Sequence, residues 1–257
     1  MKKKLKLQII LFISSFLLFS GCIAPEEPSI EFTGISINKE KMFSTMSDAI
    51  DAAKDNDVIW VGEGIYNETL EINKTISIIG SGANSTIFDV NAENPSPVFA
   101  INADYCIIKN ISIKNSYPYE DDVGFAMAIK IKSSHNVIEY ISIQNFSFGI
   151  QIENQDYNYI NYTNIVAKSV GIEILNANYN KIINCSVSNC HEFGVFIGIK
   201  SMYNHVYDSF FYNCDNGIRL KDAQKNTIYR NTLRECRTGI YECCGAEENG
   251  IFFNIEE

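Results

Sequence analysis

The sequence is poor in several residue types on which common functions depend. It has one Trp and three His in 257 residues, and its 21 Lys and Arg are outnumbered by 31 Asp and Glu. The net charge of −10, with no basic cluster beyond residue 6, argues against nucleic acid or an anionic membrane surface as a partner. Beyond residue 54 no segment has apolar residues at helical spacing over a length that could cover a sheet. The composition therefore favours a fold of strands and turns.

A repeat of about 22 residues takes the place of helices. The repeated residues are Asn136, Asn158, Asn180, Asn204 and Asn226, together with Gly149, Gly171, Gly194, Gly217 and Gly239. Between them, apolar and polar residues alternate in short runs divided by turn formers, which is the spacing of β-strands. Three short strands per repeat predict an all-β fold, a single-stranded right-handed parallel β-helix whose coils lie about 4.8 Å apart.

The register of the repeat also predicts what fills the interior. We expect one interior column to consist of Ile138, Ile160, Ile182, Val206 and Ile228. The repeated Asn should occupy inward turn positions, where its amide can bond the turn backbone and the Asn of the next coil. The repeated Gly should serve a positive φ or a close approach of two backbones.

The first residues form a targeting segment. Four Lys within residues 1–6 precede an apolar run over residues 7–19, and small residues lead into Cys22. The run is short for a transmembrane helix, and residues 1–21 resemble a lipoprotein signal peptide. The resemblance implies a lipid on Cys22, a tether over residues 22–33 and a β-helix domain over residues 34–257, held at the outer side of a prokaryotic cell membrane by the lipid alone. An uncleaved signal anchor is the alternative, and both place the domain outside the cytoplasm.

One short helix is expected, over about residues 44–54. Thr45 and Asp48 form a capping-box-like start, and Met46, Ala49 and Ile50 follow at helical spacing. Such a helix can plug the open apolar end of a β-helix. The stretch AIDAAKDNDVIWVGEGIYNETLEINKTISIIG resembles the N-terminal cap of pectin-lyase-like β-helices. With the later coils, the chain is most similar to the NosD type of periplasmic β-helix, a family named for copper binding, and this resemblance implies the fold but no copper ligand.

Three cysteines share one column of the repeat: Cys190, Cys214 and Cys236. Neighbouring coils would place their Cα atoms at about 4.8 Å, within the disulfide range. A stack of free thiols, one disulfide and a soft-metal site all remain open. The three histidines lie at different positions of different coils and cannot converge on one ion, so no histidine metal site is predicted and no residue is assigned as a metal ligand.

One pair of carboxylates is a weak candidate for catalysis. Glu153 and Glu173 are expected to point outward on adjacent coils, with Cα atoms roughly 8 Å apart, a separation that can serve a glycosidase. Arg219 should lie on the same face two coils further on. The chain lacks the Gly-His-Gly element of polygalacturonases. Solvated surface charge is the alternative interpretation of these residues.

Two features favour ligand binding. Tyr157, Tyr179 and Tyr203 precede the repeated Asn, in a column with Tyr105 and His135, and by alternation they should form an outward strip for sugar faces or for another protein. One coil also carries an inserted loop, whose candidate residues are Tyr117, Tyr119, Glu120, Asp121 and Asp122. Its acidic side chains suit Ca²⁺ or a glycan, although the spacing matches no defined calcium loop. Structural stacking of the tyrosines and a solvated loop are the alternatives.

Three classes of function follow. The first is a surface-anchored extracytoplasmic lipoprotein that binds an extracellular glycan or a cell-surface protein without catalysis. The second is a carbohydrate-active enzyme, a polysaccharide lyase, hydrolase or epimerase. The third is a NosD-like accessory protein for metal handling or maturation. Apart from Ca²⁺ at the inserted loop, no cofactor is expected.

Overall fold

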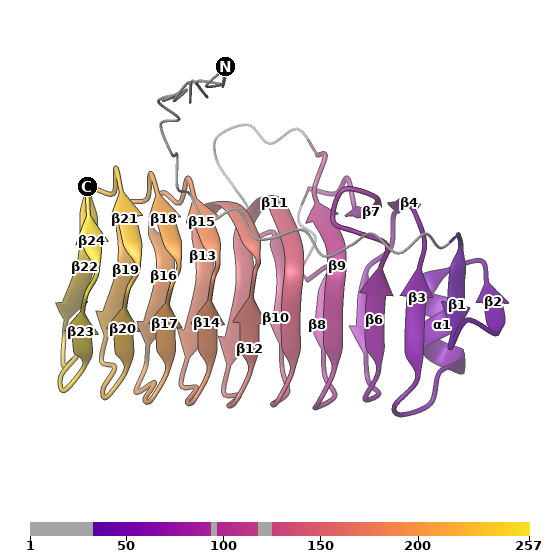
Figure 1. Cartoon of the computed structure of the whole chain (residues 1–257), viewed down its shortest axis with the longest axis horizontal. Coiled ribbons are helices and arrows are strands. Elements are labelled where there is room, and N and C mark those ends of the chain that lie inside the picture. Colours follow the sequence, from indigo (N-terminus) through magenta and orange to yellow (C-terminus); the bar gives the residue numbers. More distant parts are fainter. Residues whose placement is uncertain (1–32, 94–96, 118–124) are drawn as a thin grey trace, which may run out of the picture.

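The computed structural model describes residues 33–93, 97–117 and 125–257. Over these residues the chain winds as a right-handed parallel β-solenoid with a single short helix, as the repeat predicts. Figure 1 shows the coils side by side along the long axis, with α1 near one end and the C-terminus at the other. The expected fold is therefore confirmed.

Each coil contributes to three rows of strands. The first row contains β5 (Leu70–Ile72), β8 (Phe99–Ile101), β10 (Met127–Ile131), the end of β11 (Val137–Glu153), the end of β13 (Asn164–Leu175), β16 (Phe193–Gly198), β19 (Asn216–Lys221) and β22 (Thr238–Cys243). The second contains β3 (Val58–Val61), β6 (Ser77–Gly80), the start of β9 (Ile107–Lys114), the start of β11, β12 (Tyr159–Asn161), β14 (Lys181–Ile183), β17 (His205–Tyr207), β20 (Thr227–Tyr229) and β23 (Gly250–Phe252). The third contains β4 (Gly64–Tyr66), β7 (Thr86–Asp89), parts of β9, β11 and β13, β15 (Ser186–Ser188), β18 (Phe210–Tyr212), β21 (Thr232–Arg234) and β24 (Ile255–Glu256). From β3 onward, all these pairings are parallel.

The N-terminal end is closed by a helix and an antiparallel pair of strands. β1 (Ile35–Ile37) pairs antiparallel with both β2 (Lys41–Phe43) and β3, and α1 (Met46–Ala52) buries Met46, Ala49 and Ile50. The predicted cap is present, because the Asp48 amide donates to Thr45 Oγ1 at 3.1 Å. The helix ends at Ala52, since Ala53 has extended backbone.

Two charged side chains of the next coil hold both ends of α1. The carboxylate of Glu68 accepts the amides of Met46 and Ser47 at 2.9 and 3.0 Å. The Lys74 ammonium donates to the carbonyls of Ile50 and Asp51 at 2.9 and 2.7 Å. An anion at the N-terminus and a cation at the C-terminus also suit the helix dipole.

The interior column lies where the sequence predicts it. Its residues pair in register from coil to coil and are all fully buried: Ile138, Ile160, Ile182, Val206 and Ile228. Ile108, Ile78 and Ile59 extend the column toward α1. Burying one such side chain contributes about 1.5–3 kcal/mol, so the column is a main source of stability.

The repeated asparagines form an inward ladder. Asn180 donates its side-chain amide to Asn204 Oδ1 at 3.1 Å, and Asn204 donates to Asn226 Oδ1 at 3.0 Å. The same oxygens accept the backbone amide of the preceding ladder residue, at 2.9 Å in each case. Asn249 adds a further step that the sequence reading did not include. A second ladder, from Ser209 through Asn231 to Asn254, was also not predicted.

The repeated glycines are explained by close approach rather than by positive φ. A Cβ at Gly171 would lie 2.2 Å from Val187 Cγ1 and 2.6 Å from the Gly194 carbonyl oxygen. At Gly194 it would meet the Gly217 carbonyl oxygen at 2.5 Å. Neither glycine has positive φ, so the tight stacking of one coil on the next excludes a side chain here.

Candidate ligand-binding surface

Five ring side chains form a continuous stack along the solenoid, which we call the tyrosine strip: Tyr105, His135, Tyr157, Tyr179 and Tyr203. Neighbouring ring centroids are 4.7, 5.0, 4.9 and 5.0 Å apart along the stack. Each ring belongs to a turn that connects a strand of the first row to a strand of the second row. In the sequence, each ring residue directly precedes a buried residue. These turns repeat along the long axis in Figure 1.

The strip points outward because of the turn conformation. Its residues have φ between 57° and 62°, in the left-handed region. The prediction attributed the outward direction to strand alternation, which is wrong, since these residues are not in strands. The turns are bonded from coil to coil: the Tyr157 amide donates to the Asn178 carbonyl at 3.1 Å and the Asn178 amide to Asp156 Oδ1 at 2.6 Å. The rings are thus held in place before any ligand binds.

The stack decides which part of each ring a ligand can reach. Tyr157 is 51% exposed and Tyr179 is 42% exposed, yet the planes of these two rings differ by only 4°. Each inner ring covers the faces of its neighbours, so the accessible parts are the ring edges and hydroxyls. A sugar would therefore meet ring edges and hydroxyls along the strip, and its binding there stays a prediction. Aromatic edges carry partial positive charge and phenols donate hydrogen bonds, so the strip suits a ligand rich in oxygen acceptors.

The strip ends in charge at its C-terminal side. Lys225 Nζ lies 5.9 Å from the centroid of the Tyr203 ring and 3.7 Å from the carboxylate of Glu248 on the following coil. Both residues have positive φ, like the strip residues before them. The turn column therefore continues beyond Tyr203 with an ion pair in place of rings.

Further aromatic stacks on other faces were missed from the sequence. Tyr207 stacks on Tyr229 with centroids 4.7 Å apart, and Tyr229 stacks on Phe252 at 5.6 Å. Tyr140 and Tyr162 form a separate pair at 5.0 Å. The register of the repeat would have revealed the first of these stacks, since Tyr207 and Tyr229 are directly paired. These stacks are shorter than the strip and provide natural controls for it.

The inserted loop contributes little to the described structure. Tyr117 is half-buried, and its amide donates to Asn115 Oδ1 at 3.1 Å. Tyr119, Glu120, Asp121 and Asp122 lie outside the described residues, as does Cys22. The calcium, glycan and lipid predictions for these residues stay predictions.

The two candidate carboxylates do lie on adjacent coils of the first strand row. Gln151 pairs directly with Glu173 and donates to it at 2.6 Å, while Glu153 forms an ion pair with Lys130 at 3.1 Å. Burial, aided by the Glu153 carboxylate, raises the pKa of Glu173 against the effect of the Gln151 hydrogen bond. Such a carboxyl is suited to hold a proton.

Arg219 is engaged elsewhere. Phe196 separates it from Glu173 in the strand register, and its guanidinium carbon lies 5.2 Å from the ring centroids of both Phe193 and Tyr241. Its Nη2 donates to Cys243 Sγ at 3.4 Å. The structure therefore does not bring the predicted cation to the two carboxylates.

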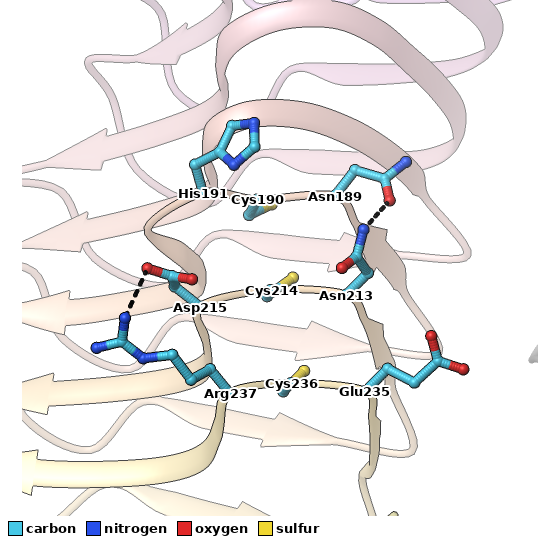
Figure 2. A pocket seen from close by; sticks show the side chains of 9 residues that line it. All are labelled: Asn189, Cys190, His191, Asn213, Cys214, Asp215, Glu235, Cys236 and Arg237. Carbon is cyan, nitrogen blue, oxygen red and sulfur yellow. Dashed lines mark hydrogen bonds and ion pairs between the residues drawn. The ribbon is translucent and has the colours of Figure 1, made fainter.

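The cysteine column is a stack of free thiols. Cys190 and Cys214 are buried and Cys236 is half-buried, beside a hollow of about 410 Å³ lined by the turns that carry them. Figure 2 shows the three sulfur atoms one above another, with Asp215 and Arg237 at one side. That ion pair measures 3.8 Å. The hydrogen bond with Cys190, together with burial, raises the pKa of Cys214 to about 12, so this thiol is inert at neutral pH.

Among the described residues, no three or more His, Cys, Asp or Glu side chains are grouped so that they could hold a metal ion. No helix in the described ranges has the length and apolar character needed to cross a membrane.

A family model described as "Right handed beta helix region" matches residues 127–255. No curated protein matches the chain in sequence. Among solved structures, a pectin methylesterase in complex with a hexasaccharide is 13% identical, with a TM-score of 0.57 over 80% of this chain and 78% of that one. The catalytic domain of a GH87 α-1,3-glucanase in complex with nigerose is 15% identical, with a TM-score of 0.62 over 91% of this chain and 46% of that one. The tailspike of Acinetobacter phage vb_AbaP_AS12 is 10% identical, with a TM-score of 0.61 over 77% and 39%.

Proposed function

The chain belongs to the right-handed β-helix family, and on that scaffold we propose that it is a non-catalytic binding protein for an extended glycan, displayed outside the cytoplasm on a lipid at Cys22. The glycan lies along the tyrosine strip, parallel to the solenoid axis. Its oxygens accept hydrogen bonds from the phenols, and its CH groups contact the ring edges.

The uninterrupted stack of five rings carries this proposal. Rings that only stabilised the sheet could occur in shorter runs, as Tyr207, Tyr229 and Phe252 do. The strip instead extends over five coils at a nearly constant spacing of 4.7–5.0 Å. A periodic row of donors on rigid turns fits a polymer better than a compact molecule, because each further unit of the polymer finds an equivalent contact.

The structural neighbours support a carbohydrate ligand. The pectin methylesterase is described with a hexasaccharide and the GH87 glucanase with nigerose, so two proteins of similar fold bind saccharides. At 13–15% identity the likeness concerns the fold, and the choice of the tyrosine strip rests on this chain's own residues.

The proposed lipid anchor at Cys22 can be tested separately from glycan binding. Cys22→Ser should leave the precursor unprocessed or release the protein from the membrane fraction, since a lipid would have no attachment point. Fractionation and mass spectrometry of the mature N-terminus measure both outcomes. An N-terminus at another residue, with unchanged membrane partition, would contradict the lipid anchor while leaving glycan binding untouched.

The decisive experiment replaces Tyr157, Tyr179 and Tyr203 together by Ser in the whole chain. A glycan array followed by titration calorimetry should show affinity reduced at least tenfold, because several contacts vanish at once. Tyr207→Ser with Tyr229→Ser is the matched control, for it removes an equivalent stack on another face. Circular dichroism must show both variants folded. If both variants bound the glycan with the affinity of the wild type, the proposal would be contradicted.

A second candidate, a carbohydrate-active enzyme, is favoured by Glu173 alone. Its raised pKa favours the protonated carboxyl, and with Glu153 it gives two carboxyl groups on adjacent coils, the kind of pair that glycoside cleavage uses. Turnover of an acidic polysaccharide by the wild type, abolished in Glu173→Gln and retained in the tyrosine variant, would establish this function in place of binding. The described residues offer no comparable feature for a metal-handling role.

A further inference from the structure

Two adjacent cysteines stand apart from the other thiols. Cys243 ends β22 and is partly exposed, and Cys244 follows it fully exposed, with φ of 55°. The remaining described cysteines are Cys106, Cys185, Cys190, Cys214 and Cys236, of which all but Cys236 are buried. Among the described thiols Cys244 is therefore the most exposed, and Cys243 and Cys236 are the two that are partly exposed.

A guanidinium is held against the first of these thiols. Arg219 Nη2 donates to Cys243 Sγ at 3.4 Å. The rings of Phe193 and Tyr241, each with its centroid 5.2 Å from the guanidinium carbon, keep the arginine in place. Lys221 adds a second cation, because it is the direct strand partner of Cys243.

The charged groups facing this thiol are mainly positive. Arg219 and Lys221 come from β19, the strand paired with β22. On the cysteine's own strand, Glu242 is engaged with Asn249, whose side-chain amide donates to it at 2.8 Å. Asp222 follows Lys221, and its backbone amide donates to the Cys243 carbonyl at 3.4 Å. Arg219 thus contacts the sulfur and Lys221 lies beside it in the strand register, while the carboxylate of Glu242 is engaged elsewhere.

We propose that Cys243 and Cys244 form a thiol-modification site, at which Cys243 exchanges with anionic low-molecular-weight disulfides. Cys243 loses its proton to solvent, and the thiolate attacks one sulfur of the reagent. The reagent's S–S bond breaks, a Cys243–S–S–R bond forms, and the second half leaves as RS⁻. Cys243 is thereby oxidised and half of the disulfide is reduced to a thiolate. The two cations attract the reagent's negative groups and stabilise the attacking thiolate.

The electrostatic surroundings agree with this assignment. The hydrogen bond with Cys244 lowers the pKa of Cys243 most; burial opposes it, and the Arg219 hydrogen bond and the charges of Arg219 and Lys221 add smaller lowering effects. The pKa of Cys244 is raised by the same contact between the two thiols. Cys243 is therefore the member of the pair that ionises first.

The mixed disulfide should persist once it has formed. Closing a bond between adjacent cysteines would join Cα atoms only about 3.8 Å apart. Disulfides normally span about 4.4–6.8 Å, so a bridge between Cys243 and Cys244 would be strained and easily reduced. Release of the bound group consequently depends on an external thiol.

The test compares two disulfide probes of opposite charge on the full chain, the dianion 5,5′-dithiobis(2-nitrobenzoate) and the dication cystamine. Peptide mass spectrometry should find the first adduct on Cys243, formed faster by the anionic probe. Cys243→Ser should abolish the fast phase. Arg219→Gln should slow the anionic probe about tenfold and cystamine at most about twofold, and should move the pH–rate profile to higher pH.

Two further variants keep the experiment decisive. Arg219→Lys retains the charge and should recover part of the rate and most of the preference for the anionic probe. Arg234→Gln removes an arginine on β21 and should change neither probe's rate, and circular dichroism monitors folding throughout. A first adduct on another cysteine, or an unchanged ratio of the two probe rates in Arg219→Gln, would overturn the proposal.

Discussion

At its N-terminal end the solenoid is covered by α1 and the β1–β2 pair, whereas its last coil leaves inward-facing positions open to solvent. Met46 and Ala49 of α1 are fully buried against the first coil. At the other end, Ile251 is 37% exposed and Ile255 is 54% exposed. Ile251 lies in the interior column, whose member one coil earlier, Ile228, is fully buried, whereas Ile255 pairs with half-buried Thr232.

The comparison shows that the inward side chains of a coil are buried only where a neighbouring coil or a cap packs against them. Ile182, Ile228 and Ile251 share a residue type and a column, yet only the last is partly exposed. Burial in a repeat protein is thus a property of the interface between neighbouring repeats more than of the residue itself. The four predictions below use matched residues from the middle and from the ends to test this.

The largest effect is expected from a charge placed in the shared column. Ile182→Asp buries an unpaired carboxylate between two coils, which should cost at least about 4 kcal/mol and prevent stable folding. Ile251→Asp, in the same column, should cost less than about 1 kcal/mol because water reaches the site. Urea unfolding followed by circular dichroism measures both. Similar losses for the two variants would contradict the comparison.

The cap at the N-terminal end should come next. Ile50→Ala removes most of a buried side chain from α1 and should lower the free energy of unfolding by about 3 kcal/mol, with amide hydrogen exchange increasing first in β3 and β5. Ile255→Ala at the open end is the control, and we expect a loss below about 1 kcal/mol. Uniform exchange along the whole solenoid would show that α1 does not protect the first coil separately.

The asparagine ladder offers a smaller contrast. Asn204→Ala leaves the backbone amide of Asn180 without its side-chain acceptor in a dry interior and removes one of the acceptors of its side-chain amide, which should cost about 2–3 kcal/mol. Asn249→Ala removes the equivalent acceptor from Asn226, but this last step is partly exposed. Water can replace it, and the expected cost is about 1 kcal/mol. Thermal unfolding scans should rank the two variants in this order.

The smallest effect concerns a charge on the flank of a middle coil. The pKa of Glu173 is raised on folding, so its contribution favours the folded state below the unfolded pKa and is lost as pH rises through the folded pKa. Glu173→Gln should therefore stabilise at pH 8, by less than about 1 kcal/mol after solvent screening, and have no such benefit at pH 3. Exposed Glu247→Gln on the last coil is the control. A gain that is equal at both pH values would refute the assignment.

Most of the fold could be predicted from the sequence, because a short pattern that is ambiguous on its own recurs at a constant period. A single run such as Asn-x-Ile is ambiguous, but five runs at one period placed Ile182 and its column inside and Asn204 on the ladder. The helix was readable from Thr45, since a cap and an apolar spacing coincide there. The Glu68 and Lys74 contacts that fix α1 were not readable, because they join segments more than twenty residues apart.

The candidate site was predictable only as a set of residues. The column of Tyr157, Tyr179 and Tyr203 follows from the period, but the exposure of ring edges depends on the left-handed turns, which spacing does not reveal. Arg219 lies in the predicted place in the strand register, but its contacts were not predictable, because register does not show where a long side chain bends. The Cys243–Arg219 contact depends on the same bend.

The backbone of the tyrosine strip has an evolutionary consequence. A left-handed conformation costs an ordinary residue roughly 1–2 kcal/mol, while glycine and asparagine adopt it readily. In another turn column, Asn145, Asn189 and Asn213 hold this conformation. Drift under selection for folding alone would be expected to bring asparagine to the strip as well, yet five successive coils keep a ring. Rings thus replace asparagine at left-handed turns of the strip, as they also do at Tyr140 and Tyr162, so this backbone cost is met in two separate ring stacks.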